Sequence, residues 1–157
     1  KVTIFIPEEK QYIEKNQKKE TIQEIDGNNA NVLILDDEPM ILYILERMLK
    51  KLNFTVYSAP SGRELVNKYK DLKSKGVPVD FLILDIYVPG ELNGQETLNE
   101  IRLIDPDIMA VATTGYTDDN IISDPEKHGF QTVLPKPYSR MDLNEVIHKI
   151  YQLKKMQ

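Results

Sequence analysis

From Asn31 onward, short apolar runs alternate strictly with longer amphipathic segments, and few folds accommodate this order. Each apolar run has the length of a buried strand, and each amphipathic segment has the periodicity of a helix that buries one face. Alternating strands and helices predict an α/β fold with a parallel sheet and crossover helices. We expect strands near 31–35, 54–58, 80–84, 108–113 and 131–134, and helices near 38–51, 61–75, 95–104, 118–127 and 139–154.

The predicted elements differ in regularity. The first helix has Pro39 in its opening turn and then an apolar stripe at helical spacing, made of Ile41, Ile44, Leu45, Met48 and Leu49. The helix near 118–127 is the least regular, because Pro125 lies inside it. The strand near 80–84 is apolar on both faces, which indicates a central strand with helices on both sides of the sheet, a three-layer sandwich.

The first 30 residues form an extension with a different pattern. Residues 1–7 alternate between two faces and end in proline, which predicts a lone half-buried strand. Residues 8–24 mix charges of both signs with few apolar side chains. The polar stretch 26–29 then ends this segment. We therefore expect a linker over 8–30 and one globular domain over 31–157.

The composition excludes several classes of function. A net charge of -5 and a pI near 5.1 argue against a nucleic-acid-binding surface. The sequence has no run of about 18 apolar residues, so we expect this segment neither to cross nor to contact a membrane. The chain has no cysteine, which excludes disulfides and thiol chemistry. A cytoplasmic location fits these properties.

Polar side chains follow four of the predicted strands at the point where each strand ends. They are Asp36 and Asp37, Asp85, Thr113 and Lys136. In doubly wound sheets, ligands bind at the carboxyl ends of the strands, beside the topological switch point. We therefore expect these side chains to line one acidic pocket.

The types of these residues indicate phosphoryl chemistry. Three clustered carboxylates repel one another unless a cation lies among them, and an all-oxygen ligand set favours Mg²⁺ or Mn²⁺ over zinc. Lys136 and the hydroxyl of Thr113 are suited to bind the oxygens of a phosphoryl group. Asp85, between a metal ion and an ammonium group, is then a candidate nucleophile for phosphoryl transfer.

With these motifs in place, residues 31–152 resemble the receiver domain of two-component response regulators. The resemblance rests on Asp36-Asp37, on Asp85 with Pro89, on Thr113-Thr114-Gly115 and on Lys136-Pro137, in this order. It implies a flavodoxin-like (βα)5 fold with strand order 2-1-3-4-5 and a cis bond before Pro137.

The same resemblance implies a role for each site residue. Asp85 would accept a phosphoryl group from a phosphohistidine. Asp37, Asp85 and the backbone carbonyl of Tyr87 would ligate magnesium, and Asp36 would hold a metal-bound water. Lys136 and Thr113 would contact the phosphoryl oxygens. The implied partner is a histidine kinase or a histidine phosphotransfer domain, and a homodimer is also compatible. The domain itself would catalyse only its own phosphorylation and dephosphorylation.

A narrower resemblance concerns receivers fused to the C-terminus of hybrid sensor histidine kinases. It rests on the long loop from Asp85 to Gly94, on the segments 114–117 and 134–138, and on a first segment similar to the last strand of a kinase ATPase domain. The chain starts at Lys1 without methionine, so we expect a fragment of a hybrid kinase whose parent chain is membrane-anchored or cytoplasmic. A free-standing single-domain regulator is the main alternative.

Some residues depart from the family pattern. Val133 stands three residues before Lys136, where many receivers carry an aromatic that rotates when the threonine moves. The usual coupling of threonine to aromatic is therefore not expected. Tyr87 and Gly115 stand at positions that in the family help to set the dephosphorylation rate, and their combination predicts no specific lifetime.

Other functions fit the sequence less well. A haloacid-dehalogenase-type phosphatase needs a second aspartate two residues after its nucleophile, where this chain has Tyr87. A flavin carrier of similar fold needs a Ser/Thr/Gly-rich phosphate loop after the first strand, where this chain has two aspartates. A degenerate receiver that acts only as an interaction module would lack phosphorylation residues that are present here.

Overall fold

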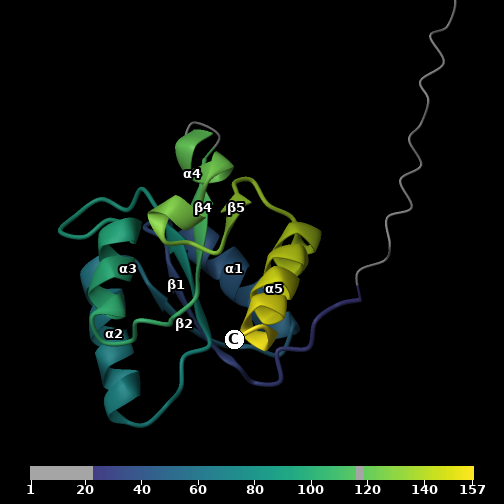
Figure 1. Ribbon diagram of the computed structural model, residues 1–157, viewed down its shortest axis with the longest axis horizontal. Helices are drawn as coiled ribbons and strands as arrows, with labels where there is room; N and C mark the ends of the chain where they lie inside the picture. Colours follow the sequence, from purple (N-terminus) through teal and green to yellow (C-terminus); the bar gives the residue numbers. More distant parts are fainter. Residues whose placement is uncertain (1–22, 116–118) are drawn as a thin grey trace, which may run out of the picture.

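The structure is a computed structural model that describes residues 23–115 and 119–157, so the predicted strand over 1–7 lies outside the described residues. Five parallel strands form one sheet in the order β2-β1-β3-β4-β5 (Figure 1). This is the flavodoxin-like α/β fold that the sequence predicts. The strands are β1 (Asn31–Leu35), β2 (Thr55–Ala59), β3 (Phe81–Asp85), β4 (Ala110–Thr114) and β5 (Thr132–Pro135). The helices are α1 (Pro39–Lys51), α2 (Gly62–Ser74), α3 (Gly94–Arg102), α4 (Asp119–Ser123), the 3-10 turn η1 (Glu126–His128) and α5 (Arg140–Lys155).

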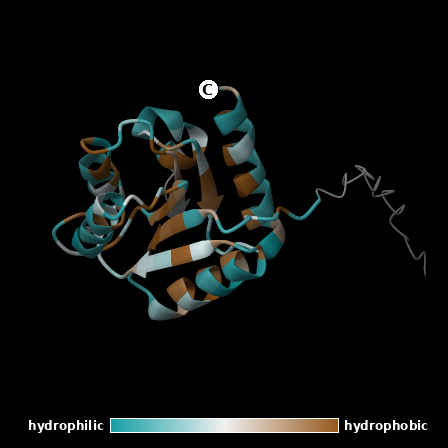
Figure 2. Cartoon of the chain, turned by 90° about the horizontal axis from the view of Figure 1, so that it is seen from below, coloured by the Kyte–Doolittle hydropathy of each residue, from teal (hydrophilic) through white to brown (hydrophobic). Residues whose placement is uncertain are grey.

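The sheet lies between two layers of helices, and alternate residues of its strands face opposite layers. In β1, Leu33 and Leu35 pack in the cluster that includes α2 and α3, whereas Val32 and Ile34 pack in the cluster that includes α1 and α5. Every residue of β3 is buried, as expected of a central strand. Apolar colour accordingly concentrates in the sheet and on the inward faces of the helices (Figure 2). None of the described helices is long and apolar enough to span a membrane.

Side-chain caps define where several helices begin. Ser61 accepts a hydrogen bond from the Glu64 backbone at the start of α2. Asn93 and Glu96 form a reciprocal capping box at the start of α3. Such caps satisfy backbone N–H groups that have no partner within the helix. α1 lacks a side-chain cap and begins instead with Pro39, the residue expected in its first turn.

The prediction of one helix over 118–127 is wrong. α4 ends at Ser123, and a separate 3-10 turn follows at Glu126–His128. Pro125 causes this break, because it has no N–H to donate to the preceding turn and disfavours the helical conformation of Asp124. Gly129, with φ of 85°, then ends the turn in the left-handed region.

The last part of the predicted linker packs against the domain. We call residues 23–30 the N-terminal strap. Its Gly27 N–H donates to the carbonyl of Leu52 at 2.6 Å, and its Ile25 N–H donates to Asn144 of α5 at 2.9 Å. The side chain of Ile25 packs against the apolar cluster under α1 and α5. The strap therefore runs along the α1 and α5 side of the sheet (Figure 1).

Candidate functional site

The carboxyl ends of the strands bring the candidate residues to one edge of the sheet. Asp85 is the last residue of β3, and Thr113 lies directly opposite it on β4. Asp36 follows the end of β1, and Lys136 follows the end of β5. The candidate residues of all four strands are therefore at the same edge, because parallel strands end together.

A single ammonium group links two of the carboxylates. The Nζ of Lys136 lies 2.6 Å from Oδ2 of Asp36 and 2.8 Å from Oδ2 of Asp85. The bond from Lys136 to Pro137 is cis, as the family resemblance predicts. Lys136 is 51 residues from Asp85 in the chain, so this contact depends entirely on the topology of the sheet.

The second oxygen of each buried carboxylate accepts a backbone hydrogen bond. Oδ1 of Asp36 accepts from the N–H of Glu38 at 2.9 Å. Oδ1 of Asp85 accepts from the N–H of Tyr87 at 3.0 Å. Both carboxylates are thereby held in one orientation, since each has a backbone partner on one oxygen and an ammonium on the other.

Burial changes the protonation equilibria of this cluster. Burial raises the pKa of Asp36 above its ordinary value, against the opposing effect of its hydrogen bonds to Lys136 and Glu38. Burial would also lower the pKa of Lys136, but its hydrogen bonds to Asp36 and Asp85 outweigh burial and raise that pKa. Lys136 is therefore firmly protonated, and one positive charge is shared by two buried acids.

Asp37 completes an acidic set that fits a hard divalent cation. One oxygen from each of Asp36, Asp37 and Asp85 lies within 4.8 Å of the others. Asp37 is exposed, whereas the other two are buried. Three carboxylates and one ammonium leave an excess of negative charge, and all the donors are oxygens. This donor set suits Mg²⁺ or Mn²⁺, which prefer carboxylates and water.

Thr113 and Val133 lie on the two strands beside this cluster. Thr113 is buried next to Asp85 in the sheet register. Val133 is partly buried and packs against the apolar core cluster on the α2 and α3 side of the sheet. The aliphatic side chain of Val133 is thus part of the packing, where many receivers have a rotating aromatic.

Gly94 is a residue for which the sequence patterns predicted no role. A Cβ at this position would lie 2.2 Å from the carbonyl oxygen of Asp85, closer than any tolerated contact. The first turn of α3 therefore approaches the backbone of Asp85 as only glycine allows. The available signal was a glycine directly after Asn93, a residue type that favours helix starts, close in sequence to Asp85.

Comparison with known proteins decides the family. Residues 32–148 match the family described as the response regulator receiver domain. The chain belongs to this family. The receiver is 32% identical over 142 residues to the sensor kinase CckA of Brucella abortus. The alignment covers 88% of this chain and 14% of that protein. It is 30% identical over 120 residues to the chemotaxis protein CheY of Thermotoga maritima, which covers 76% of this chain and 95% of that protein.

Solved structures agree with the observed fold of the receiver. A receiver domain protein from Clostridium thermocellum superposes with a TM-score of 0.69 and 28% identity, over 81% of this chain and 98% of that one. The sequence relatives include both a kinase many times longer than this chain and a protein of about receiver size. The family is therefore clear, while the type of parent protein is a separate question.

Proposed function

We propose that this receiver accepts a phosphoryl group on Asp85 from a phosphohistidine, as one step of a two-component phosphorelay. The observation that carries the proposal is the environment of Asp85. Its carboxylate lies 2.8 Å from the Nζ of Lys136 and within 4.8 Å of Asp36 and Asp37 oxygens. A structural ion pair has no need of further carboxylates at the same point, whereas a metal ion that assists phosphoryl transfer needs carboxylate ligands.

In the proposed reaction, an oxygen of Asp85 attacks the phosphorus while the bond between phosphorus and the donor imidazole nitrogen breaks. The bond's electron pair stays on that nitrogen, and the imidazole leaves as neutral histidine because its other ring nitrogen carries a proton taken from solvent. The product is an acyl phosphate on Asp85. Lys136 pairs with the charge on the phosphoryl oxygens, and the Thr113 hydroxyl donates a hydrogen bond to one of them.

Asp37, Asp85 and the backbone carbonyl of Tyr87 would hold Mg²⁺ or Mn²⁺, with Asp36 binding a metal-bound water. The bound ion would neutralise charge on the transferring phosphoryl group. The chain's own contribution is orientation: the Tyr87 N–H and Lys136 fix the Asp85 carboxylate before a donor arrives.

The proposed partner is a histidine kinase or a histidine phosphotransfer domain, met on the cytoplasmic side of the membrane. We further propose that the parent protein is a hybrid sensor histidine kinase. The similarity to the sensor kinase CckA supports this context. The similarity over nearly the whole length of a chemotaxis protein supports the alternative, a free-standing regulator. The sequence flanking Lys1 in the parent gene distinguishes the two.

The phosphoacceptor proposal is tested with a small phosphodonor. Incubation with acetyl phosphate and Mg²⁺ should add the mass of one phosphoryl group, as measured by intact-protein mass spectrometry. Asp85→Asn should remove this label, because an amide oxygen is too weak a nucleophile. Borohydride reduces the acyl phosphate to an alcohol and releases the phosphate, so peptide mapping should find the reduced side chain at position 85.

A matched control separates this effect from a general loss of charge. Asp107→Asn removes an exposed carboxylate from the turn between α3 and β4, at the other end of the sheet. This variant should be labelled as fast as the wild type. Equal labelling of Asp85→Asn and the wild type would overturn the proposal.

A further inference from the structure

The loop that follows Asp85 carries one of the proposed metal contacts and projects from the domain. We call residues 86–93 the β3–α3 loop. Its Ile86 and Val88 are buried, but Tyr87 is 59% exposed and the tip at 89–91 is exposed. Such a loop has few apolar contacts at its tip, so other interactions must hold it in one conformation.

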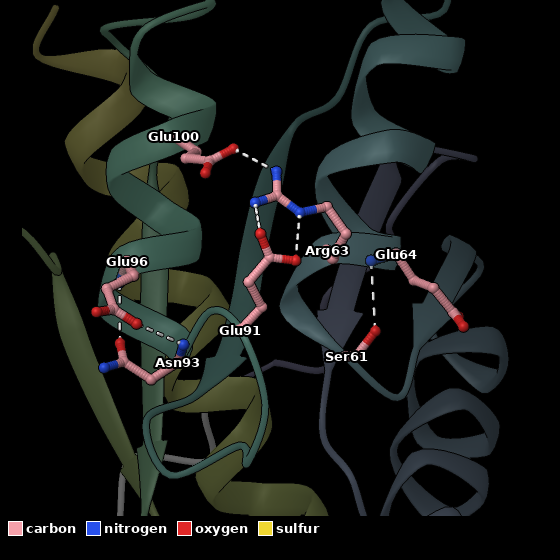
Figure 3. A network of polar contacts seen from close by, with 7 residues as sticks. All are labelled: Ser61, Arg63, Glu64, Glu91, Asn93, Glu96 and Glu100. Atoms are coloured by element: carbon pink, nitrogen blue, oxygen red, sulfur yellow. Dashed lines mark hydrogen bonds and ion pairs between the residues drawn. The ribbon is translucent and has the colours of Figure 1, made fainter.

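An arginine of α2 holds the tip of this loop. Arg63 binds Glu91 through two hydrogen bonds, from Nε at 3.2 Å and from an Nη at 2.6 Å. Its other Nη donates to Glu100 of α3 at 3.1 Å. Figure 3 shows the guanidinium between the two carboxylates, with α2 on one side and the loop and α3 on the other. We call this set of three residues the Arg63 clamp.

The geometry of the clamp distinguishes it from an ordinary surface ion pair. Isolated exposed pairs contribute little, but a bidentate arginine within a network of several charges is the exception. The guanidinium uses both edges, so the loop tip is fixed relative to two helices rather than one. The hydrogen bonds to Glu91 raise the pKa of Arg63, and those from Arg63 lower the pKa of Glu91.

The base of the clamp is rigid. At Gly62, the residue before Arg63, an added Cβ would lie 2.2 Å from Oγ1 of Thr97 and 2.6 Å from the carbonyl oxygen of Leu92. The first turn of α2 is thus in close contact with α3 and with the end of the loop. Asn93 then closes the loop through its capping box with Glu96. The clamp therefore holds the tip of a loop whose end is already fixed.

We propose that Arg63 is a positioning residue for the phosphoacceptor site, which it serves by fixing the β3–α3 loop through Glu91 and Glu100. This inference rests on the proposed function, because the loop matters through the Tyr87 carbonyl and through the Tyr87 N–H that holds Asp85. Without the clamp, the loop tip moves more freely, and Mg²⁺ binding has to order the loop before the Tyr87 carbonyl can contribute.

The test compares Mg²⁺ affinity and loop mobility in Arg63→Ala and in the wild type. Isothermal titration with MgCl₂ should show about a three- to tenfold loss of affinity, at or below the lower end of effects caused by residues that orient metal ligands. Hydrogen exchange of the metal-free protein should be faster at the amides of Tyr87, Val88, Gly90 and Glu91 and unchanged in β3. Arg63→Lys should recover only part of the affinity, because an ammonium cannot bind a carboxylate through two nitrogens.

Two further measurements separate positioning from a general structural effect. In a double-mutant cycle with Glu91→Ala, the second substitution should add little to the first, because both remove the same contact. The ratio of affinities between wild type and Arg63→Ala should also shrink in about 1 M NaCl, where exposed charges are screened within roughly 3 Å. Arg47→Ala, which removes an exposed arginine from α1, is the control and should bind Mg²⁺ like the wild type.

Each outcome decides between the proposals. An Arg63→Ala protein with wild-type affinity and wild-type loop exchange would overturn the role of Arg63 while leaving the phosphoacceptor proposal in place. Full additivity in the cycle would likewise overturn action through Glu91. A wild-type protein that binds no Mg²⁺ and takes no label on Asp85 would overturn the proposed function and this inference together.

Discussion

Asp36 is a residue whose position is costly for folding. It is only 2% exposed, and it shares the ammonium of Lys136 with Asp85. A buried carboxylate that shares its only ammonium partner with a second carboxylate destabilises the folded state relative to a neutral side chain of the same shape. The raised pKa of Asp36 indicates this cost. The proposed metal site explains why an acid is retained there, since functional sites commonly sacrifice stability.

Asp36→Asn should therefore stabilise the metal-free protein near pH 7. Asn keeps an oxygen for the Glu38 N–H and leaves Lys136 to Asp85 alone. In the wild type, the folded state binds a proton more tightly at Asp36 than the unfolded state does, so stability falls as pH rises through the raised pKa. A gain of about 1 kcal/mol would raise the melting temperature by roughly 2–4 °C. Thermal unfolding in EDTA measures it.

The pH dependence of this gain is its control. The difference between the two proteins should shrink as the pH falls through the raised pKa of Asp36, and it should vanish below the unfolded-state pKa, where the acid is protonated in both states. A variant less stable than the wild type at pH 7 would contradict the account of Asp36 as an under-compensated charge.

Lys136→Ala should have the opposite effect on stability. Removing the ammonium leaves Asp36 and Asp85 buried without their shared cation, which costs about 3–5 kcal/mol when one partner of a buried pair is lost. Mg²⁺ should then raise the melting temperature of this variant more than that of the wild type, because it replaces the missing charge. Lys75→Ala, in an exposed pair with Asp71, is the control and should change stability by less than about 1 kcal/mol. An equal Mg²⁺ response in all three proteins would count against a shared site.

At the scale of elements, long helices with a strong hydrophobic period were predicted well from the sequence. Short elements were predicted poorly. α1 was expected over 38–51 and spans Pro39–Lys51, and α5 was expected over 139–154 and spans Arg140–Lys155. Both helices bury a long apolar stripe, which makes the helical period visible in the sequence. α4 has five residues, too few for a period to be resolved, and the proline after it determined its end.

Gly94→Ala tests how the first turn of α3 supports Asp85. The added methyl group would lie 2.2 Å from the Asp85 carbonyl oxygen and 3.0 Å from the Cα of Ile86, so backbone has to move. We expect a loss of about 1–3 kcal/mol, as for other overpacked sites, together with slower labelling by acetyl phosphate. Urea unfolding measures the first effect. Gly115→Ala, where a Cβ meets no atom of the described residues within 4 Å, should unfold like the wild type.

At the scale of the whole molecule, the topology of the sheet made the site predictable from the sequence. The pairing of surface side chains could not be predicted in this way. Asp85 and Lys136 meet because parallel strands end at one edge, so hydrophobic patterns alone predicted their proximity. The contact of Arg63 with Glu91 joins two surface residues 28 positions apart, and the hydrophobic periodicity of the sequence does not indicate such a pair. The packing of the N-terminal strap was equally hidden, since residues 23–30 contribute few apolar side chains.

The strap allows a prediction about where the folding unit begins. The Asn144 side chain, only 7% exposed, accepts a hydrogen bond from the Ile25 N–H and donates one to the Gln23 carbonyl at 3.4 Å. The Ile25 side chain packs against the apolar cluster that includes α5. A chain beginning at Asn31 loses these hydrogen bonds and exposes apolar surface of α5 to water. We expect it to lose about 2–4 kcal/mol of unfolding free energy in urea.

A chain beginning at Gln23 is the matched control, since it keeps the contacts that the structure describes for the strap, and it should be more stable than the chain beginning at Asn31. Both shortened proteins should still be labelled at Asp85, because the strap contacts α5 and the turn after α1 rather than the ends of the strands. Equal stability of the two shortened proteins would mean that the strap is bound but does not stabilise the domain. A large difference would instead show that residues 23–30, which precede β1, belong to the folding unit of the receiver.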